Sequence, residues 1–437
     1  MKTKNIYIIL ALILASFTAN AQTDTLRLDS VITRVLRSHP TLLDAQEAIN
    51  IAENQIKIAK SGYLPTVTGS ASYTRLDPVS KIKFGTQDFS FIPNDNYDIS
   101  VKYSQILYDF GKTAHSVELE QANKAVSEQN IETLKQKLAM NTISTYYVLA
   151  YLDKAISIKD EEIKNLNNHL QFIETKAKTG SATQFEILTT KVKISNTESQ
   201  KVDLQSNRET QQYQLNNLMG VSTNAKIAAS YSFLNQAKTQ LQPDSLISYA
   251  TQHRNEIAVL TKQQDVIALQ IKINESQNNP VLAAFATVGG KNGYTISSSN
   301  TTQQDLVPNL AAGVSFNVPL FDGFRKKNMI QIARSRGNSL NYQLDNAKRA
   351  ISNEVANAML LVRSNKTKIE QFKLQVQQAS TAVDLAKVSF EAGAITNMEL
   401  LDAETNLAES KLMLIKSQVD YQISLTALDL ALGNRLY

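Results

Sequence analysis

Apolar residues recur at alternating steps of three and four along two long stretches of the chain. The first stretch includes Ile163, Leu166, Leu170, Ile173 and Ala177, and the second includes Ile369, Phe372, Val376, Ala379, Val383, Ala386 and Phe390. Seven-residue repeats sustained over this length predict α-helices that supercoil around one another. The 68 residues between Gly111 and Gly180 contain neither Gly nor Pro, so a helix over about 112–176 meets no helix-breaking residue.

Each long stretch ends in the same short pattern, Gly-x-x-Thr-x-x-Glu. The pattern occurs at Gly180, Thr183 and Glu186 and again at Gly393, Thr396 and Glu399. Glycine suits the left-handed residue that closes a helix, and Thr followed three residues later by Glu is a capping box that opens the next helix. The pattern therefore predicts tight turns over about 178–183 and 391–396, followed by antiparallel return helices over roughly 183–219 and 396–433.

Three shorter segments alternate between apolar and polar residues with a period of two, as β-strands do, and a fourth, over 281–289, is rich in Val, Ala and Phe with weaker alternation. We expect strands over about 66–76, 97–107, 281–289 and 309–319. Pro65 and Pro280 stand where a helix should stop and a strand begin. Strands of about 9–11 residues cross a bilayer when they are tilted. The segments 77–96 and 290–308, rich in Gly, Pro, Asn, Asp and Ser, are expected to be exposed loops.

The chain is an internal duplication. Asp29 and Pro65 align with Asp244 and Pro280 at an offset of 215, and Gly180 and Gly220 align with Gly393 and Gly433 at an offset of 213. Offsets this constant indicate two repeats. We expect a first repeat over 22–220, a linker over 221–243 and a second repeat over 244–437. Each repeat is helix, strand, strand, long helix, hairpin and helix, which is a mainly α member of the α+β class.

The N-terminus has the features of an export signal. Lys2 and Lys4 precede an apolar stretch over 6–17, and Ala19-Asn20-Ala21 is a small-x-small cleavage site. The stretch is too short to span a bilayer as a helix, so residues 1–21 are expected to be a signal peptide. The protein is therefore expected to be periplasmic, secreted, or inserted in the outer membrane as β-strands.

Composition excludes several classes of chemistry. There is no Cys, so disulfides, thiolate metal sites and Cys nucleophiles are excluded. The four His are isolated in sequence, and no catalytic, metal or cofactor motif is found, so we do not expect an enzyme. Nucleic-acid binding is disfavoured, because the net charge is only +5 and falls to +3 once Lys2 and Lys4 are removed (5 − 2 = 3).

Four strands per chain cannot close a membrane barrel. An open sheet edge in lipid leaves backbone groups without hydrogen bonds, and single-chain barrels have at least about eight strands. Symmetry solves the shortage, since a dimer supplies eight strands and a trimer twelve. The pattern of residues leaves both copy numbers open.

With these features the chain resembles the TolC-like family of outer-membrane efflux proteins. The resemblance covers essentially the whole mature chain and rests on the two Gly-x-x-Thr-x-x-Glu hairpins, the elements Leu107-Tyr108-Asp109 and Leu320-Phe321-Asp322, and Pro65 and Pro280. It implies a homotrimer in which a 12-stranded outer-membrane β-barrel is continuous with a periplasmic α-helical coiled-coil barrel. It also implies a passive exit duct for efflux or type I secretion, whose partners are a periplasmic adaptor, an inner-membrane transporter and outer-membrane lipid.

The resemblance also implies a constriction of acidic residues at the periplasmic tip. Glu399 and Asp402 lie six and nine residues after Gly393, where such acids are expected, and Glu186 is the first-repeat counterpart of Glu399. Glu186 and Glu399 are also explained as capping carboxylates, and Asp402 as part of a solvated helix face. Adaptor docking is expected at the hairpin turns, represented by Gly180, Thr183, Gly393 and Thr396. Phe390 and Ile395 stand where well-known members have a Tyr and an Arg that lock the tip.

Two alternatives to a channel remain at this point. A periplasmic adaptor also has coiled-coil hairpins, although four bilayer-length strands and the duplication argue against it. An exported enzyme on a helical scaffold would need clustered catalytic groups. One basic run, Arg325-Lys326-Lys327, is interpreted either as a contact with anionic headgroups at the membrane surface or as a solvated first helical turn. The exported substrate, the class of pump and the resting state of the tip stay open.

Overall fold

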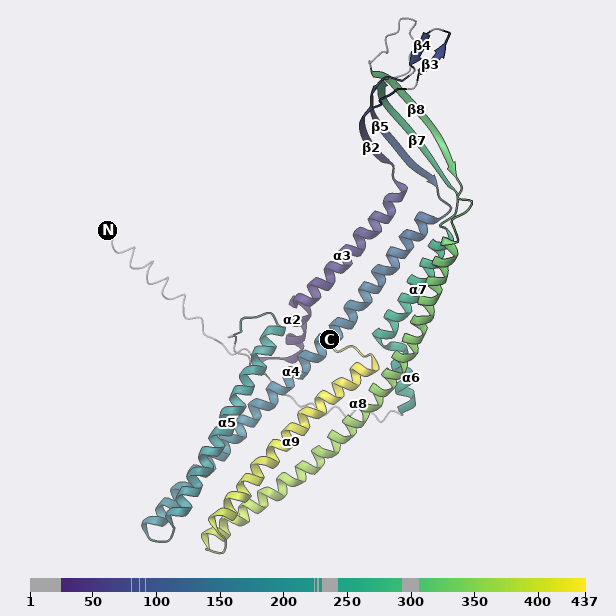
Figure 1. Ribbon diagram of the computed structural model, residues 1–437. Helices are drawn as coiled ribbons and strands as arrows, with labels where there is room; N and C mark the ends of the chain where they lie inside the picture. The colour runs from purple at the N-terminus through teal and green to yellow at the C-terminus, as the bar shows by residue number, and fades with distance from the viewer. Residues whose placement is uncertain are drawn as a thin grey trace, which may run out of the picture. The chain divides into compact units, whose positions relative to one another are not determined.

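The computed structural model describes residues 25–292 and 306–437, except for residues 80, 86, 91, 224, 226–227 and 230–242. The helices are α2 (Leu28–Ser38), α3 (Pro40–Lys60), α4 (Lys112–Lys178), α5 (Gln184–Leu218), α6 (Pro243–His253), α7 (Asn255–Glu275), α8 (Arg325–Glu391) and α9 (Asn397–Leu432). The strands are β1 (Thr25–Leu26), β2 (Thr66–Arg75), β3 (Lys81–Phe84), β4 (Gln87–Ser90), β5 (Asp95–Tyr108), β6 (Ala228–Ala229), β7 (Val281–Asn292) and β8 (Leu306–Asn317). The protein is thus mainly helical with a small sheet, as expected (Figure 1).

The chain divides into two compact units. One contains the sheet and its adjoining helical segments, residues 46–130 and 258–345. The other contains both helical hairpins and consists of the described residues within 25–45, 131–257 and 346–437. We call them the sheet unit and the hairpin unit. The long helices α4 and α8 contribute segments to both units and are each 67 residues long, as a duplication requires.

The sheet unit is organised around four antiparallel strands in the order β2-β5-β7-β8 (Figure 1). The central pair, β5 and β7, joins the two repeats, with Val101 opposite Val288 and Ile99 opposite Gly290. Strand β2 pairs with β5 in its own repeat, and β8 pairs with β7. Within the described residues β2 and β8 have no second neighbour, so both outer edges of the sheet are unpaired.

The strands begin and end within a few residues of the segments that alternate in the sequence. Strand β5 extends the expected 97–107 to 95–108, and β7 extends 281–289 to residue 292. The expectation of a loop over 77–96 was wrong in part, because β3 and β4 form a short hairpin there. That hairpin has only four residues in each strand, too few for an alternation signal to stand out.

The hairpin unit contains two equivalent cores. One includes Val31, Val35, Leu215 and Leu218, and the other includes Leu246, Ala250, Leu428 and Ala431. The first two pairs differ by 215 (246 − 31 and 250 − 35) and the last two by 213 (428 − 215 and 431 − 218). The offsets found in the sequence therefore relate buried positions in space. Gly220 and Gly433 close the return helices with φ of 64° and 82°, which favours glycine.

A parallel two-residue pair of β1 and β6 was not anticipated and lies partly in the expected linker over 221–243. Most of that linker and the expected signal peptide over 1–21 lie outside the described residues. Among the described residues, no helix is both long enough and apolar enough to cross a membrane.

Candidate functional site

The two hairpin turns are built in the same way. Gly180 and Gly393 have φ of 76° and 75°, a conformation in which other residues are strained. Thr183 and Thr396 then cap α5 and α9, with complete capping boxes in both. The turns are short and exposed at both glycines, which leaves them accessible to another protein.

The three acidic residues expected at the constriction differ in what holds them. The Glu186 carboxylate accepts hydrogen bonds from the Thr183 amide at 2.7 Å and its hydroxyl at 2.9 Å, and Glu399 does the same with Thr396. The amide and then the hydroxyl of Thr396 hold the pKa of Glu399 below its usual range. Asp402 is exposed and has no hydrogen bond or ion pair with any described residue. Asp402 therefore has no local structural role that competes with a role in a pore.

A buried polar contact joins the two hairpins beside these turns. Asn397, the first residue of α9, is 4% exposed. Its Oδ1 lies 2.6 Å from Nε2 of His169 on α4, and its Nδ2 lies 3.2 Å from Oγ1 of Thr190 on α5. One side chain from the second hairpin is thus bonded to both helices of the first. No sequence motif indicated this contact, because the partners are 228 and 207 residues apart.

Phe390 occupies the position at which the resemblance implies a locking Tyr, and it is buried among aromatic and apolar groups. Its ring centroid lies 5.2 Å from that of His169, and the Lys176 ammonium lies 5.3 Å from the Phe390 centroid. Phe390 also packs in a cluster that draws on both hairpins. The other buried members of that cluster are Ile173, Ile187 and Leu400. Apolar packing and the Asn397 contact therefore occupy the place at which the resemblance implies a lock of Tyr and Arg.

A second buried polar group lies further along α9. Glu404 is 8% exposed, its Oε1 lies 3.7 Å from the Lys387 ammonium, and its Oε2 has no hydrogen-bond partner. Burial raises the pKa of this carboxyl, against the opposing charge of Lys387. It lines a cavity of about 190 Å³ between α4, α8 and α9. Glu404 follows Leu400 by four residues, so its place on the buried face could have been inferred from helix periodicity.

Metal-ligating side chains do not cluster among the residues that the structure describes. No group of three or more His, Asp or Glu side chains among them is arranged to hold a metal ion. The hairpin ends contain two capped turns, the exposed carboxylate of Asp402, and the buried contact of Asn397 that connects the two hairpins.

The chain is similar in sequence to outer membrane efflux and secretion proteins. The sequence profile of the outer membrane efflux protein family matches residues 31–221 and 246–434. The alkaline protease secretion protein AprF of Pseudomonas aeruginosa is 23% identical over 336 residues, which cover 75% of this chain and 67% of AprF. The outer membrane protein TolC of Escherichia coli K12 is 20% identical over 98% of this chain and 85% of TolC.

The fold is also similar to that of solved structures. The outer membrane protein VceC of Vibrio cholerae superposes with a TM-score of 0.73 at 19% identity, over 94% of this chain and 97% of VceC. The family profile matches the chain in two separate segments, one in each half of the duplication.

Proposed function

Because the chain belongs to the outer membrane efflux protein family, we propose that it is the outer-membrane channel of a tripartite efflux or type I secretion system. In this role it is a passive duct through which an inner-membrane pump delivers its substrate to the exterior. The observation that carries the proposal is a sheet of four strands, each 10–14 residues long, in one chain with two capped helical hairpins. In the part of the chain that the structure describes, the outer edges of this sheet, at β2 and β8, are unpaired. A channel needs both parts, one to cross the membrane and one to reach the pump.

The unpaired edges argue for a cyclic assembly. In lipid, each unpaired backbone group at β2 and β8 costs several kcal/mol, so the edges of neighbouring copies must pair. Three copies supply 3 × 4 = 12 strands, and six hairpins would then surround one axis. We propose a homotrimer, in which a 12-stranded barrel continues into a periplasmic helical tunnel.

The copy number is tested by the mass of the mature protein extracted from membranes in detergent. Light scattering that subtracts the detergent should give about three protomer masses, and only from the outer-membrane fraction. Two protomer masses would retain a barrel but contradict the trimer. A water-soluble monomer would contradict the channel and favour a periplasmic adaptor.

At the hairpin ends we propose a constriction that includes Asp402, Glu399 and Glu186. In a trimer each carboxylate is repeated three times around the axis, and rings of Asp or Glu favour cations over anions. Of the three, Asp402 is the best-supported candidate for the constriction, because Glu186 and Glu399 already serve in helix capping boxes. Adaptor docking is proposed at the turns that contain Gly180, Thr183, Gly393 and Thr396, because these turns are exposed and built alike.

Neutralising the acids should change ion selectivity. In planar bilayers, Asp402→Asn should lower the permeability of cations relative to anions, and adding Glu399→Gln should lower it further. The reversal potential in a KCl gradient measures this ratio. Glu409→Gln removes the same charge from an exposed position on α9 and should leave the ratio unchanged. A reversal potential that is the same for Asp402→Asn and the unmodified channel would remove Asp402 from the constriction.

A further inference from the structure

The junction between strand and long helix is built twice in the sheet unit. In the first repeat Asp109 precedes Phe110, which has a left-handed φ of 55°, and its Oδ2 accepts a hydrogen bond from the Thr113 amide at 2.7 Å. In the second, Asp322 precedes Phe324, with φ of 62°, and its Oδ2 accepts a hydrogen bond from the Lys326 amide at 2.9 Å. Both carboxylates therefore satisfy the first turn of the helix that follows.

The charges that follow the two junctions are not duplicated. Residues 323–344 hold five basic and no acidic side chains. These are Arg325, Lys326, Lys327, Arg334 and Arg336. Residues 110–129 of the first repeat hold two Lys and three Glu, and Lys124 there is paired with Glu53 at 2.8 Å. The same local fold thus forms without the cations, which indicates that they serve another purpose.

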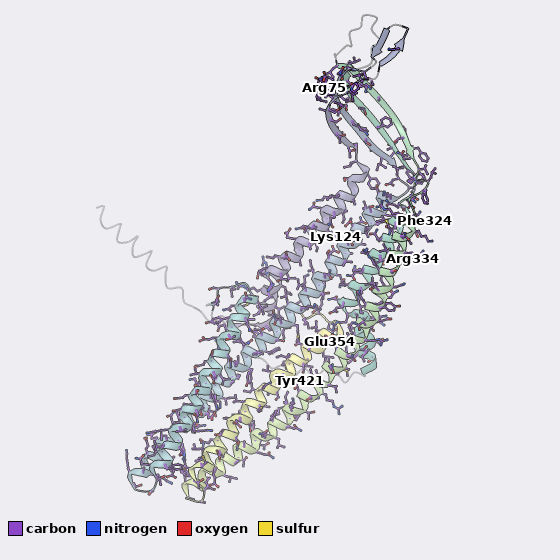
Figure 2. The ribbon with its side chains drawn as sticks, in the orientation of Figure 1. Arg75, Lys124, Phe324, Arg334, Glu354 and Tyr421 are labelled. Atoms are coloured by element: carbon purple, nitrogen blue, oxygen red, sulfur yellow. The ribbon has the colours of Figure 1, made fainter. Side chains whose placement is uncertain are left out.

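Three of these cations line one cavity. Lys326, Lys327 and Arg334 lie around a volume of about 430 Å³ that Phe324 and Asn278 also border. Figure 2 labels two of these residues, Phe324 and Arg334. None of the three makes an ion pair with a carboxylate in the part of the chain that the structure describes. Asp322 borders the same cavity, but its Oδ2 is already bonded to the Lys326 amide and, at 2.9 Å, to Asn278 Nδ2. The cavity therefore has an excess of unpaired positive charge.

Beside the cavity the chain exposes large apolar groups. Leu320, Phe321 and Phe324 are 93%, 76% and 63% exposed, in the segment between the end of β8 and the start of α8. A soluble anion would need only the cations, whereas an anion carried on acyl chains needs an apolar surface as well. Aromatic residues are characteristic of the rims of membrane barrels.

We propose that this cavity binds the phosphate headgroup of an anionic phospholipid in the periplasmic leaflet of the outer membrane. This assignment rests on the proposed function, which puts the end of β8 at that leaflet. Lys326, Lys327 and Arg334 hold the phosphate oxygens, Asn278 donates a further hydrogen bond, and Leu320, Phe321 and Phe324 contact the acyl chains. The first-repeat junction has no counterparts of these three cations and does not bind the lipid.

The test is native mass spectrometry of the delipidated full-length mature protein in non-ionic detergent, titrated with phosphatidylglycerol. Each basic side chain at an anionic membrane surface strengthens binding by roughly fivefold, so Lys326→Gln/Lys327→Gln/Arg334→Gln should weaken it about a hundredfold. The control Lys112→Gln/Lys348→Gln/Arg349→Gln removes three charges at the first junction and elsewhere on α8, and should bind as the unmodified protein does. Phosphatidylcholine and glycerol phosphate should bind to neither variant measurably.

Three results would overturn the site. Equal phosphatidylglycerol binding by both triple variants would show that charge at this cavity is irrelevant. Glycerol phosphate that binds as tightly as the lipid would assign the cavity to a free phosphate compound. Dissociation of the cavity variant into protomers before lipid is added would show that the cations pair with a neighbouring copy. Failure of the unmodified protein to be extracted from membranes as an oligomer would instead refute the proposed function, and it is seen before any titration.

Discussion

Gly289→Ala is expected to prevent assembly of the four-stranded sheet and therefore of the membrane-inserted oligomer. Gly289 lies in β7 against β5, and a Cβ at this position would overlap the carbonyl oxygen of Ile99 and lie 2.7 Å from the Cα of Ser100. Both obstacles are backbone atoms, which cannot rotate away as a side chain can. Overpacking costs about 1–3 kcal/mol even where side chains adjust, so we expect a loss of at least ~3 kcal/mol in the free energy of unfolding.

The adjacent residue provides a matched control. A Cβ on Gly290 would have its closest neighbours at 3.6 Å, which is ordinary van der Waals contact. Gly290→Ala should therefore leave the yield of oligomer from the outer-membrane fraction and its urea midpoint close to those of the unmodified protein. If both variants assembled equally well, β5 and β7 would not approach each other as described, and the pairing that joins the two repeats would be wrong.

Asn397→Ala is expected to loosen the two hairpins and raise the conductance of the channel. Asn397 is bonded to both α4 and α5, and its removal leaves Nε2 of the buried His169 without its hydrogen-bond partner, whereas the Thr190 hydroxyl keeps its bond to the Glu186 carbonyl. An unsatisfied buried polar group costs about 1–3 kcal/mol. Since each 1.4 kcal/mol is about tenfold in an equilibrium constant, the hairpins should separate roughly five- to a hundredfold more often. Single-channel recordings in planar bilayers measure this as more frequent and larger openings.

A double-mutant cycle distinguishes this contact from general destabilisation. His169→Ala should have a similar effect to Asn397→Ala, and the double variant should be less affected than the sum of the two, because they remove the same hydrogen bond. Asn406→Ala, at an exposed position on α9, should conduct as the unmodified channel does. Purely additive effects, or openings unchanged by Asn397→Ala, would show that this contact does not hold the tip closed.

The hairpins could be predicted from the sequence because the residues that specify them are close together in the chain. Glycine at a left-handed position and a Thr–Glu capping box act within seven residues, and the return helices begin at Gln184 and Asn397, one residue inside the expected ranges. The strands were accessible because alternation has a period of two and several cycles fit in each. The hairpin of β3 and β4 was missed because four-residue strands hold too few cycles.

The polar contacts of the candidate site could not be predicted from such local patterns. Asn397 and His169 are in contact although they are 228 residues apart, and no sequence pattern near either residue indicates the other as its partner. Glu404 lies two residues after Asp402, but one is buried against Lys387 and the other is exposed. Helix periodicity places Glu404 on the buried face with Leu400, but its position beside Lys387 and the cavity of about 190 Å³ depends on the neighbouring helices.

By itself, the sequence determined the duplication, the long helices with their capped turns, and the presence of membrane-length strands. Each of these follows from the conformational preferences of neighbouring residues or from a repeat in the sequence. Both are present whatever the tertiary arrangement of the chain. Only the tertiary structure decided the strand order β2-β5-β7-β8, the contact of Asn397 with His169 and Thr190, and the cavity of unpaired cations beside Phe324. These depend on how segments far apart in the chain pack together, and packing is selected by the sum of many weak contacts.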